Sequence, residues 1–245
     1  MIERQIDIPT ADGATSTFIV HPERDGPHPL ILFYMDAPAI REELRDMARR
    51  FASSGYYVML PNLYYREGVM ELGPLSPDPE HPSRKQMFAL MNGLTIPMVM
   101  SDNDALLAFA DADAAANTAR VGTVGYCMSG QFSINAAAHR SDRVVASASI
   151  YGTYLVTDRD NSPHLKARET GAELYFACAE TDVWAPMDMV RDLETSLKAD
   201  GLPAEVEIYP GTHHGFAFPQ RPAYDKLSAE RHWERLVALF GRNLG

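Results

Sequence analysis

The short segment Gly125-Tyr-Cys-Met-Ser129 constrains the fold of this chain more than any other. It follows the apolar run 121–124 and precedes small, helix-compatible residues that begin at Gly130. A strand, a sharp turn and a helix in this order form a nucleophile elbow, which exposes one reactive side chain, here the thiol of Cys127. The glycine two residues before the cysteine permits the tight turn, whereas Ser129 stands where glycine is usual. The helix dipole and the free N–H groups of the first helical turn favour a thiolate at this position.

Two other interpretations remain open when this segment is taken alone. Cysteine is among the most frequently buried residues, so a cysteine behind an apolar strand also fits a position in the core. A turn between a strand and a helix also suits phosphate binding. However, Gly122, Gly125 and Gly130 do not have the spacing G-x-G-x-x-G, and no Gly-Lys-Ser/Thr follows, so nucleotide binding is weakly supported.

The composition limits the class of protein. A chain of 245 residues with 46% hydrophobic residues is long enough for one large core, and we expect a single domain over residues 1–245. The net charge of −11 disfavours nucleic acids and anionic membrane surfaces, because both require a basic footprint. No segment resembles a transmembrane helix or a secretory signal. The two cysteines, Cys127 and Cys178, do not suggest an oxidising compartment, so we expect a cytoplasmic protein with free thiols.

Segments typical of strands alternate with segments typical of helices. This alternation predicts an α/β fold with a mostly parallel sheet that carries helices on both faces. A pair of short strands at 6–8 and 16–20 flanks Asp12-Gly13 and predicts an antiparallel hairpin at one edge of the sheet. The remaining predicted strands are 30–34, 56–60, 121–126, 144–150, 172–177 and 204–209, and the predicted helices are 42–53, 102–116, 187–200 and 225–243.

Two polar segments interrupt this pattern. Residues 67–82 are rich in proline, glycine and acidic residues, and residues 157–169 are similarly polar. Both are predicted to be loops. Ligands bind beyond the carboxyl ends of parallel strands, so both loops are candidates for the wall of a pocket.

A thiol nucleophile needs a base and an acid that orients the base. Asp182 follows the strand predicted at 172–177, and His213 and His214 follow the strand predicted at 204–209. In this type of site the nucleophile comes first in the sequence, the acid second and the histidine third, and each follows a strand. The order found here is the expected one. Three alternatives stay open on spacing alone: Asp182 caps the next helix, Glu180 is the acid, or His213 is the base. Cys127, Asp182 and a histidine nevertheless favour catalysis over a core cysteine.

Acyl transfer also needs two donors for the oxyanion. The N–H of Met128, directly after the nucleophile, is predicted to be one of them. The other is expected in the turn after the strand at 30–34, where Ala37 has an N–H and Pro38 has none. Asp36 in the same turn is predicted to lie near the thiol and to modulate its protonation.

With these residues identified, the chain resembles the dienelactone hydrolase family, the carboxymethylenebutenolidase-like α/β-hydrolases. The resemblance extends over nearly the whole sequence. It rests on Tyr34-Met-Asp-Ala-Pro38, Gly125-Tyr-Cys-Met128, Ser162-Pro-His-Leu165, Asp182 with Pro186, and His214-Gly-Phe216. It implies one compact α/β-hydrolase domain with a catalytic triad of Cys127, Asp182 and His214. It also favours His214 over His213, and it implies that Asp36 controls the thiol, as a glutamate does in the enzyme that hydrolyses dienelactone.

The chain departs from that enzyme after the histidine. Phe218 stands where the resemblance places an arginine that holds a substrate carboxylate. This difference predicts a preference for uncharged substrates, unless Arg66, Arg84 or Lys85 supplies the cation from the neighbouring loop. Several other side chains are predicted to line the substrate pocket, most of them aromatic. They are Tyr65, Tyr151, Tyr154, His164, Trp184, Phe216 and Phe218.

The sequence therefore predicts a hydrolase, of carboxylesterase or lactonase type, that cleaves a small ester or enol-lactone through an acyl-enzyme on Cys127. The alternatives are hydrolysis of a C–C or thioester bond on the same fold, and a ligand-binding or redox-sensing thiol without turnover. We expect a small-molecule substrate, no nucleic-acid or membrane partner, and a monomer or homodimer. No cofactor is expected, and no metal, because no histidine or cysteine cluster has metal-ligand spacing.

Overall fold

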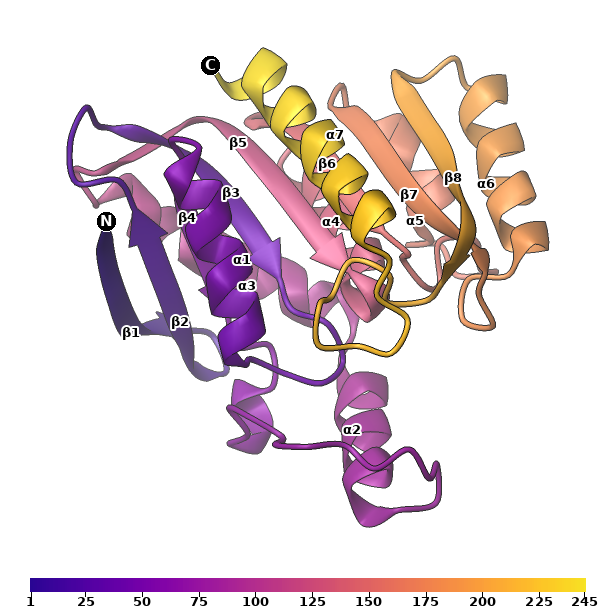
Figure 1. The fold of residues 1–245 in the computed structure, drawn as a ribbon. Coiled ribbons are helices and arrows are strands. Elements are labelled where there is room, and N and C mark those ends of the chain that lie inside the picture. The colour runs from indigo at the N-terminus through magenta and orange to yellow at the C-terminus, as the bar shows by residue number, and fades with distance from the viewer. The chain divides into compact units, whose positions relative to one another are not determined.

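The computed structural model describes all residues, 1–245. The chain divides into two compact units, residues 1–118 and 119–245, which we describe separately. Each unit contains four strands flanked by helices (Figure 1). No helix is both long and apolar enough to span a bilayer.

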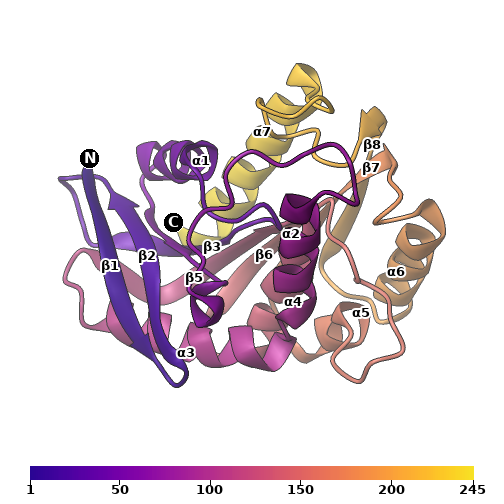
Figure 2. The ribbon, with the colours of Figure 1, turned by 90° about the horizontal axis from the view of Figure 1, so that it is seen from below.

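The first unit begins with a hairpin of two long strands, β1 (Ile2–Thr10) and β2 (Gly13–His21), paired antiparallel from end to end. Strand β2 pairs antiparallel with β4 (Tyr57–Pro61), and β4 pairs parallel with β3 (His28–Tyr34). Helices α1 (Glu42–Ser53) and α3 (Ile96–Asp111) cover opposite faces of these strands (Figure 2). A short 3₁₀ turn, η1 (Tyr65–Glu67), and helix α2 (Pro82–Gly93) lie between β4 and α3 in the sequence.

The second unit is entirely parallel, with strands in the order β5-β6-β7-β8. Helices α4 and α7 contact β6 from opposite faces (Figure 2). The short elements η2 (Cys127–Ser129), α5 (Pro163–Lys166) and η3 (Ala167–Glu169) complete the unit. Its strands and longer helices are β5 (Ala116–Tyr126), α4 (Gly130–His139), β6 (Val144–Ile150), β7 (Glu173–Thr181), α6 (Met187–Ala199), β8 (Ala204–His213) and α7 (Lys226–Leu244).

The predicted fold class is confirmed: strands alternate with helices, most strand pairs are parallel, and the N-terminal hairpin is antiparallel. The helix predicted at 42–53 and the strand predicted at 144–150 have the predicted bounds. Both predictions are correct because the apolar side chains that formed each sequence pattern are buried in the structure. That the whole chain is one domain stays a prediction.

The segment before α3 was predicted incorrectly. Helix α3 begins at Ile96 rather than at residue 102, because the Thr95 hydroxyl accepts the N–H of Met98 and Pro97 occupies the first turn. Helix α2 was not predicted at all. Only Met87 and Leu90 of its residues are buried, so it lacks the apolar stripe that marks an amphipathic helix. The sequence signals for its start were Pro82 and the ring of His81, which accepts the N–H of Ser83.

Candidate active site

Strand β5 ends at Tyr126, and the chain turns sharply at Cys127 before α4 begins. Cys127 has a φ of 56°, in the left-handed region that residues other than glycine rarely adopt. Such strained backbone persists only where the surrounding structure enforces it, and it concentrates at functional sites. Here the Cys127 carbonyl accepts the N–H of Thr153, at 3.0 Å, from the segment that follows β6. The thiol is half-buried.

Two glycines make this turn possible. A Cβ on Gly125 would overlap the carbonyl oxygen of Ser129, so only glycine fits there. A Cβ on Gly130 would overlap both the Ser149 hydroxyl and the Cα of Gly152, which shows how closely α4 approaches the end of β6. Ser129 itself is completely buried, and the turn accommodates its side chain.

Asp182 and His214 are in direct contact, although they lie in loops after different strands. The Asp182 Oδ2 atom is 2.7 Å from Nδ1 of His214. Since a carboxylate only accepts hydrogen bonds, Nδ1 carries the proton, and Nε2 is the nitrogen that faces away from Asp182. The other carboxylate oxygen, Oδ1, accepts the N–H groups of Trp184 at 2.8 Å and Ala185 at 3.1 Å. Asp182 therefore organises its own loop and orients the histidine at the same time.

The competing residues lie elsewhere. Glu180 is exposed, and its carboxylate accepts the N–H of Gly211 at 2.7 Å. His213 is the last residue of β8 and its side chain is exposed, whereas only 18% of the His214 side chain is exposed. The geometry therefore joins Asp182 to His214 rather than to His213.

The His214 imidazole interacts electrostatically with the thiol. Burial alone lowers the pKa of His214, but the negative charge of the Cys127 thiolate and the hydrogen bond to Asp182 raise it, to about 10. The Nε2 atom is buried and has no hydrogen bond of standard geometry. Cys127 is thus close enough to His214 for its charge to act on the imidazole.

The second cysteine has a different environment. Cys178 lies in β7, and only 3% of it is exposed. Burial, with the nearby charge of Asp182, raises the pKa of its thiol to about 12. Cys178 is therefore a protonated core residue at neutral pH.

Three aromatic residues of the predicted pocket form a cluster behind His214. Tyr151, Phe216 and Phe218 are completely buried. The Tyr151 ring contacts the imidazole edge-to-face, with ring centroids 4.9 Å apart, and also contacts the Phe216 ring at 5.3 Å. Phe218 packs on Tyr126, directly before the cysteine. These side chains fix the position of the imidazole and present no surface to solvent.

The other predicted pocket residues of the second unit are more accessible. Tyr154 and Trp184 are 40% and 45% exposed, in the loops that follow β6 and β7. His164 is half-buried, and its Nδ1 lies 2.8 Å from the Ser162 hydroxyl. Tyr154 and Trp184 thus present aromatic surface at the end of the unit that carries Cys127.

Sequence reasoning missed an arginine near Phe218. The Arg221 guanidinium lies over the Phe218 ring, 5.5 Å from its centroid, and its side chain passes Gly215. A cation thus lies close to Phe218 after all. The sequence argument for a preference for uncharged substrates, which assumed that no cation follows His214, therefore no longer holds. The signal in the sequence was an arginine seven residues after the histidine rather than four.

Three predicted site residues belong to the first unit. Asp36 is buried, and its carboxylate pairs with both terminal nitrogens of Arg41, at 2.5 and 3.3 Å. Ala37 is also buried. The Tyr65 hydroxyl donates to Asp102, at 2.8 Å, and contacts the hydroxyl of Thr10, so this side chain connects α3 to the hairpin. The roles of Asp36 and Ala37 in the reaction stay predictions.

The predicted donor Met128 lies in η2 and is buried. Its carbonyl accepts the side-chain amide of Gln131, at 3.1 Å, which restrains the turn from its helical side. Nothing in the sequence marked Gln131 for this function. The structure contains no group of three or more histidine, cysteine, aspartate or glutamate residues arranged to hold a metal ion.

Comparison with known proteins identifies the family. Residues 15–244 match the model of the dienelactone hydrolase family. The chain belongs to this family. A Methylorubrum extorquens protein named "Putative carboxymethylenebutenolidase" is 29% identical over 245 residues, which cover 98% of this chain and 81% of that protein. A Bradyrhizobium protein named "Probable 2-oxo-3-(5-oxofuran-2-ylidene)propanoate lactonase" is 23% identical, over 95% of this chain and 91% of its own.

Solved structures of this family share the fold. The crystal structure of a Klebsiella pneumoniae protein titled "Putative Dienelactone Hydrolase" has a TM-score of 0.86 and 26% sequence identity, and the match covers 98% of both chains. The resemblance recognised from the sequence is thus confirmed, as is a hydrolase family whose members act on lactones and esters.

The first prediction concerns the turn. Gly125→Ala forces the new Cβ against the Ser129 carbonyl, so we expect the free energy of unfolding to fall by about 1–3 kcal/mol or more. Gly93→Ala is the control, because no atom lies within 4 Å of its Cβ, and it should change stability by less than about 1 kcal/mol. Urea denaturation measures both. Equal midpoints for the two variants would contradict the packing described for the turn.

The second prediction concerns the charge of His214. Because its pKa is raised to about 10, the imidazole should stay protonated through neutral pH and lose its proton only in alkaline solution. In Cys127→Ser the thiolate is absent, and the proton should be lost at a lower pH. NMR titration of isotope-labelled histidine measures this, with His214→Gln to assign the signal and Cys178→Ala as the control. An unchanged titration in Cys127→Ser would show that the thiolate does not act on His214.

Proposed function

We propose that this protein hydrolyses a small ester or enol-lactone, with Cys127 as nucleophile and an acyl-enzyme intermediate. The observation that carries the proposal is the arrangement of His214, which is held by Asp182 at 2.7 Å and whose pKa is raised by the charge of the nearby Cys127. A strained turn that presents the cysteine and a family of lactone and ester hydrolases support the same conclusion.

In the proposed resting state, the proton of the thiol already lies on Nε2 of His214, and the Cys127 thiolate is the nucleophile of acylation. The thiolate then attacks the substrate carbonyl carbon, and the negative charge moves to the carbonyl oxygen. When this intermediate collapses, the C–O bond to the leaving group breaks and His214 returns its proton to the departing oxygen. The product alcohol, or the opened end of a lactone, is released, and the acyl group remains on Cys127 as a thioester.

Deacylation uses the same histidine as a base. Once Cys127 is acylated, its negative charge is gone, and the pKa of His214 falls because only Asp182 then opposes the effect of burial. The imidazole becomes neutral and removes a proton from the attacking water. Collapse of the second intermediate expels the sulfur and frees the acid. The charge of Cys127 thus determines whether His214 is an acid or a base.

Asp182 has a constant function through both steps. It holds Nδ1 in its protonated form, so that Nε2 is the nitrogen that exchanges the proton, and it stabilises the imidazolium. For the oxyanion we propose the N–H groups of Met128 and Ala37 as donors. Asp36 is proposed to act on the thiol only weakly, because Arg41 already neutralises its carboxylate.

The third prediction tests the reaction. With a panel of p-nitrophenyl esters and lactones, the wild type should release product and Cys127→Ala should not. Cys178→Ala is the matched control, and it should keep turnover because Cys178 is a buried core residue. Thioester and C–C substrates in the same panel distinguish the alternative hydrolases. A wild type that reacts with no substrate, although Cys127 is alkylated readily, would favour a thiol protein without turnover.

The fourth prediction separates the two histidines. His214→Ala should lower kcat about 10³-fold or more, as loss of a triad member does. His213→Ala should lower it far less, because His213 is exposed and the hydrogen bond of Asp182 goes to His214. Steady-state kinetics on the best ester of the panel measures both variants. The reverse ranking would show that His213 is the base.

A further inference from the structure

The Met128 N–H, a proposed oxyanion donor, lies in the turn between β5 and α4, within the second unit. This turn is strained at Cys127, whose φ is 56°. An N–H stabilises an oxyanion well only when its direction is fixed before the reaction. The two peptide groups on either side of the Met128 Cα atom must therefore be held in place.

The first of these peptide groups is held by the loop that follows β6. It contains the Cys127 carbonyl and the Met128 N–H, which point in opposite directions because the peptide is planar and trans. The carbonyl accepts the N–H of Thr153, at 3.0 Å, and only 4% of Thr153 is exposed. This hydrogen bond sets the direction of the Met128 N–H.

The second peptide group is held by Gln131, in the first turn of α4. The side-chain amide of Gln131 donates to the Met128 carbonyl, at 3.1 Å, and only 6% of the residue is exposed. Because the two peptide groups are joined at the Met128 Cα atom, fixing both opposes the rotation that would turn the N–H away. This second contact comes from a side chain, so a substitution can remove it.

Gln131 is itself held by Arg159, in the segment between β6 and α5. The guanidinium donates to Oε1 of Gln131, at 3.3 Å. It also donates to the Thr157 hydroxyl, at 3.3 Å, and lies over the Tyr154 ring, 5.7 Å from its centroid. Since a guanidinium only donates, the Gln131 amide has one orientation, with its oxygen toward Arg159 and its nitrogen toward Met128.

The segment Ser162-Pro-His-Leu165, which the sequence analysis singled out, stabilises the loop that carries Arg159. Ser162 is completely buried. Its hydroxyl accepts the N–H of Thr157, at 2.9 Å, and its own N–H donates to the carbonyl of Arg159, at 2.9 Å. These two bonds close a turn around Arg159, so the segment supports the residue that orients Gln131.

We infer that Gln131 is a positioning residue of the reaction: its side-chain amide, oriented by Arg159, holds the Met128 N–H toward the oxyanion. This inference rests on the proposed function. Gln131 acts through Met128 and not on the substrate, so loss of its amide weakens binding of the transition state and not of the substrate. The consequence is a fall in kcat with an unchanged KM.

The first test compares Gln131→Met with Asn135→Leu. Each variant replaces a buried amide of α4 with an apolar side chain of similar size. The Asn135 amide donates to the backbone carbonyl of Gln131, at 3.0 Å, so both variants lose the same type of hydrogen bond and should unfold at lower urea concentrations than the wild type. Only Gln131→Met should lower kcat, by about ten- to one-hundredfold, since complete loss of a donor costs about 10²–10³.

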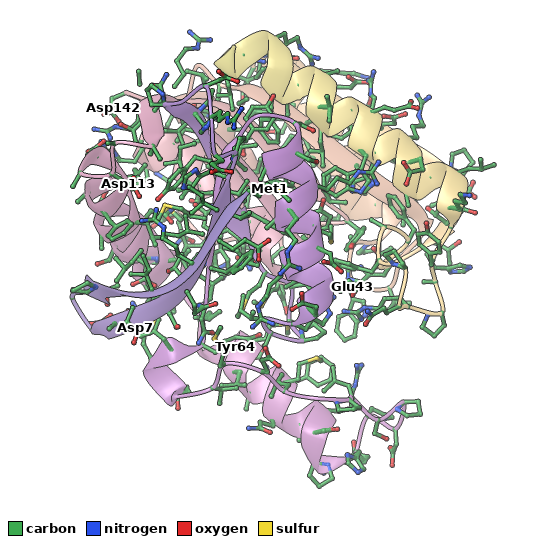
Figure 3. All side chains as sticks on the ribbon, turned by 60° about the vertical axis from the view of Figure 1, so that its left-hand side comes forward. Met1, Asp7, Glu43, Tyr64, Asp113 and Asp142 are labelled. Atoms are coloured by element: carbon green, nitrogen blue, oxygen red, sulfur yellow. The ribbon has the colours of Figure 1, made fainter.

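A double variant tests whether Arg159 acts through Gln131. Arg159→Met should lower kcat by about two- to tenfold in the wild type and have no further effect in Gln131→Met, because the two residues act as one unit. Arg140→Met is the matched control. Arg140 pairs at 2.9 Å with Asp142, labelled in Figure 3, at the opposite end of α4, and its loss should leave kcat unchanged. Losses that add in the double variant would contradict the orientation of Gln131 by Arg159.

A second readout excludes a merely structural effect. A trifluoromethyl ketone analogue of the best ester forms an oxyanion on Cys127, and its inhibition constant should weaken in Gln131→Met by the same factor as kcat/KM. A wild type that is active, with Gln131→Met equal to Asn135→Leu in kcat, or with the loss confined to KM, would overturn the inference alone. Absence of turnover in the wild type would overturn the proposed function and the inference with it.

Discussion

The interaction on which the proposed site depends is the one between the charge of Cys127 and the His214 imidazole, which raises the pKa of His214. Burial by itself would leave the imidazole neutral, and the thiolate and Asp182 together reverse that preference. A hydrogen bond of 2.7 Å from Nδ1 to Asp182 fixes the orientation of the ring, and the edge of Tyr151 packs against it. The histidine is consequently held in one orientation and one tautomer.

The fold supplies this arrangement through the ends of parallel strands. Cys127, Asp182 and His214 come directly after β5, β7 and β8, and in a parallel sheet these ends meet at one edge. The strands are buried and paired, so they place the three side chains accurately. The cost is local: Cys127 adopts an unfavourable backbone conformation, which Gly125 and the hydrogen bond from Thr153 make possible.

The order of most elements could be read from the sequence, because it depends on local patterns. Spacing brought Asp182 and a histidine together but left Glu180 and His213 open, and the family resemblance favoured His214. Buried strands are apolar runs, and each candidate residue follows such a run. Contacts between segments that are far apart in the sequence leave no local pattern of this kind. Nothing in the sequence indicated that the Tyr64 hydroxyl binds the Ala37 carbonyl or that Phe216 and Phe218 are enclosed behind the histidine. Helix α2 escaped prediction for the opposite reason, since it is largely exposed and has little apolar periodicity.

The central claim is that Cys127 carries the acyl group, and trapping that group tests it most directly. The protein is mixed with p-nitrophenyl acetate, quenched in acid while turnover continues, and digested for peptide mass spectrometry. The account predicts an acetyl group on the peptide that contains Cys127, at the cysteine, which hydroxylamine removes at neutral pH as expected of a thioester. Release of p-nitrophenol with the acetyl group on Ser129, on Cys178 or on no residue would contradict it.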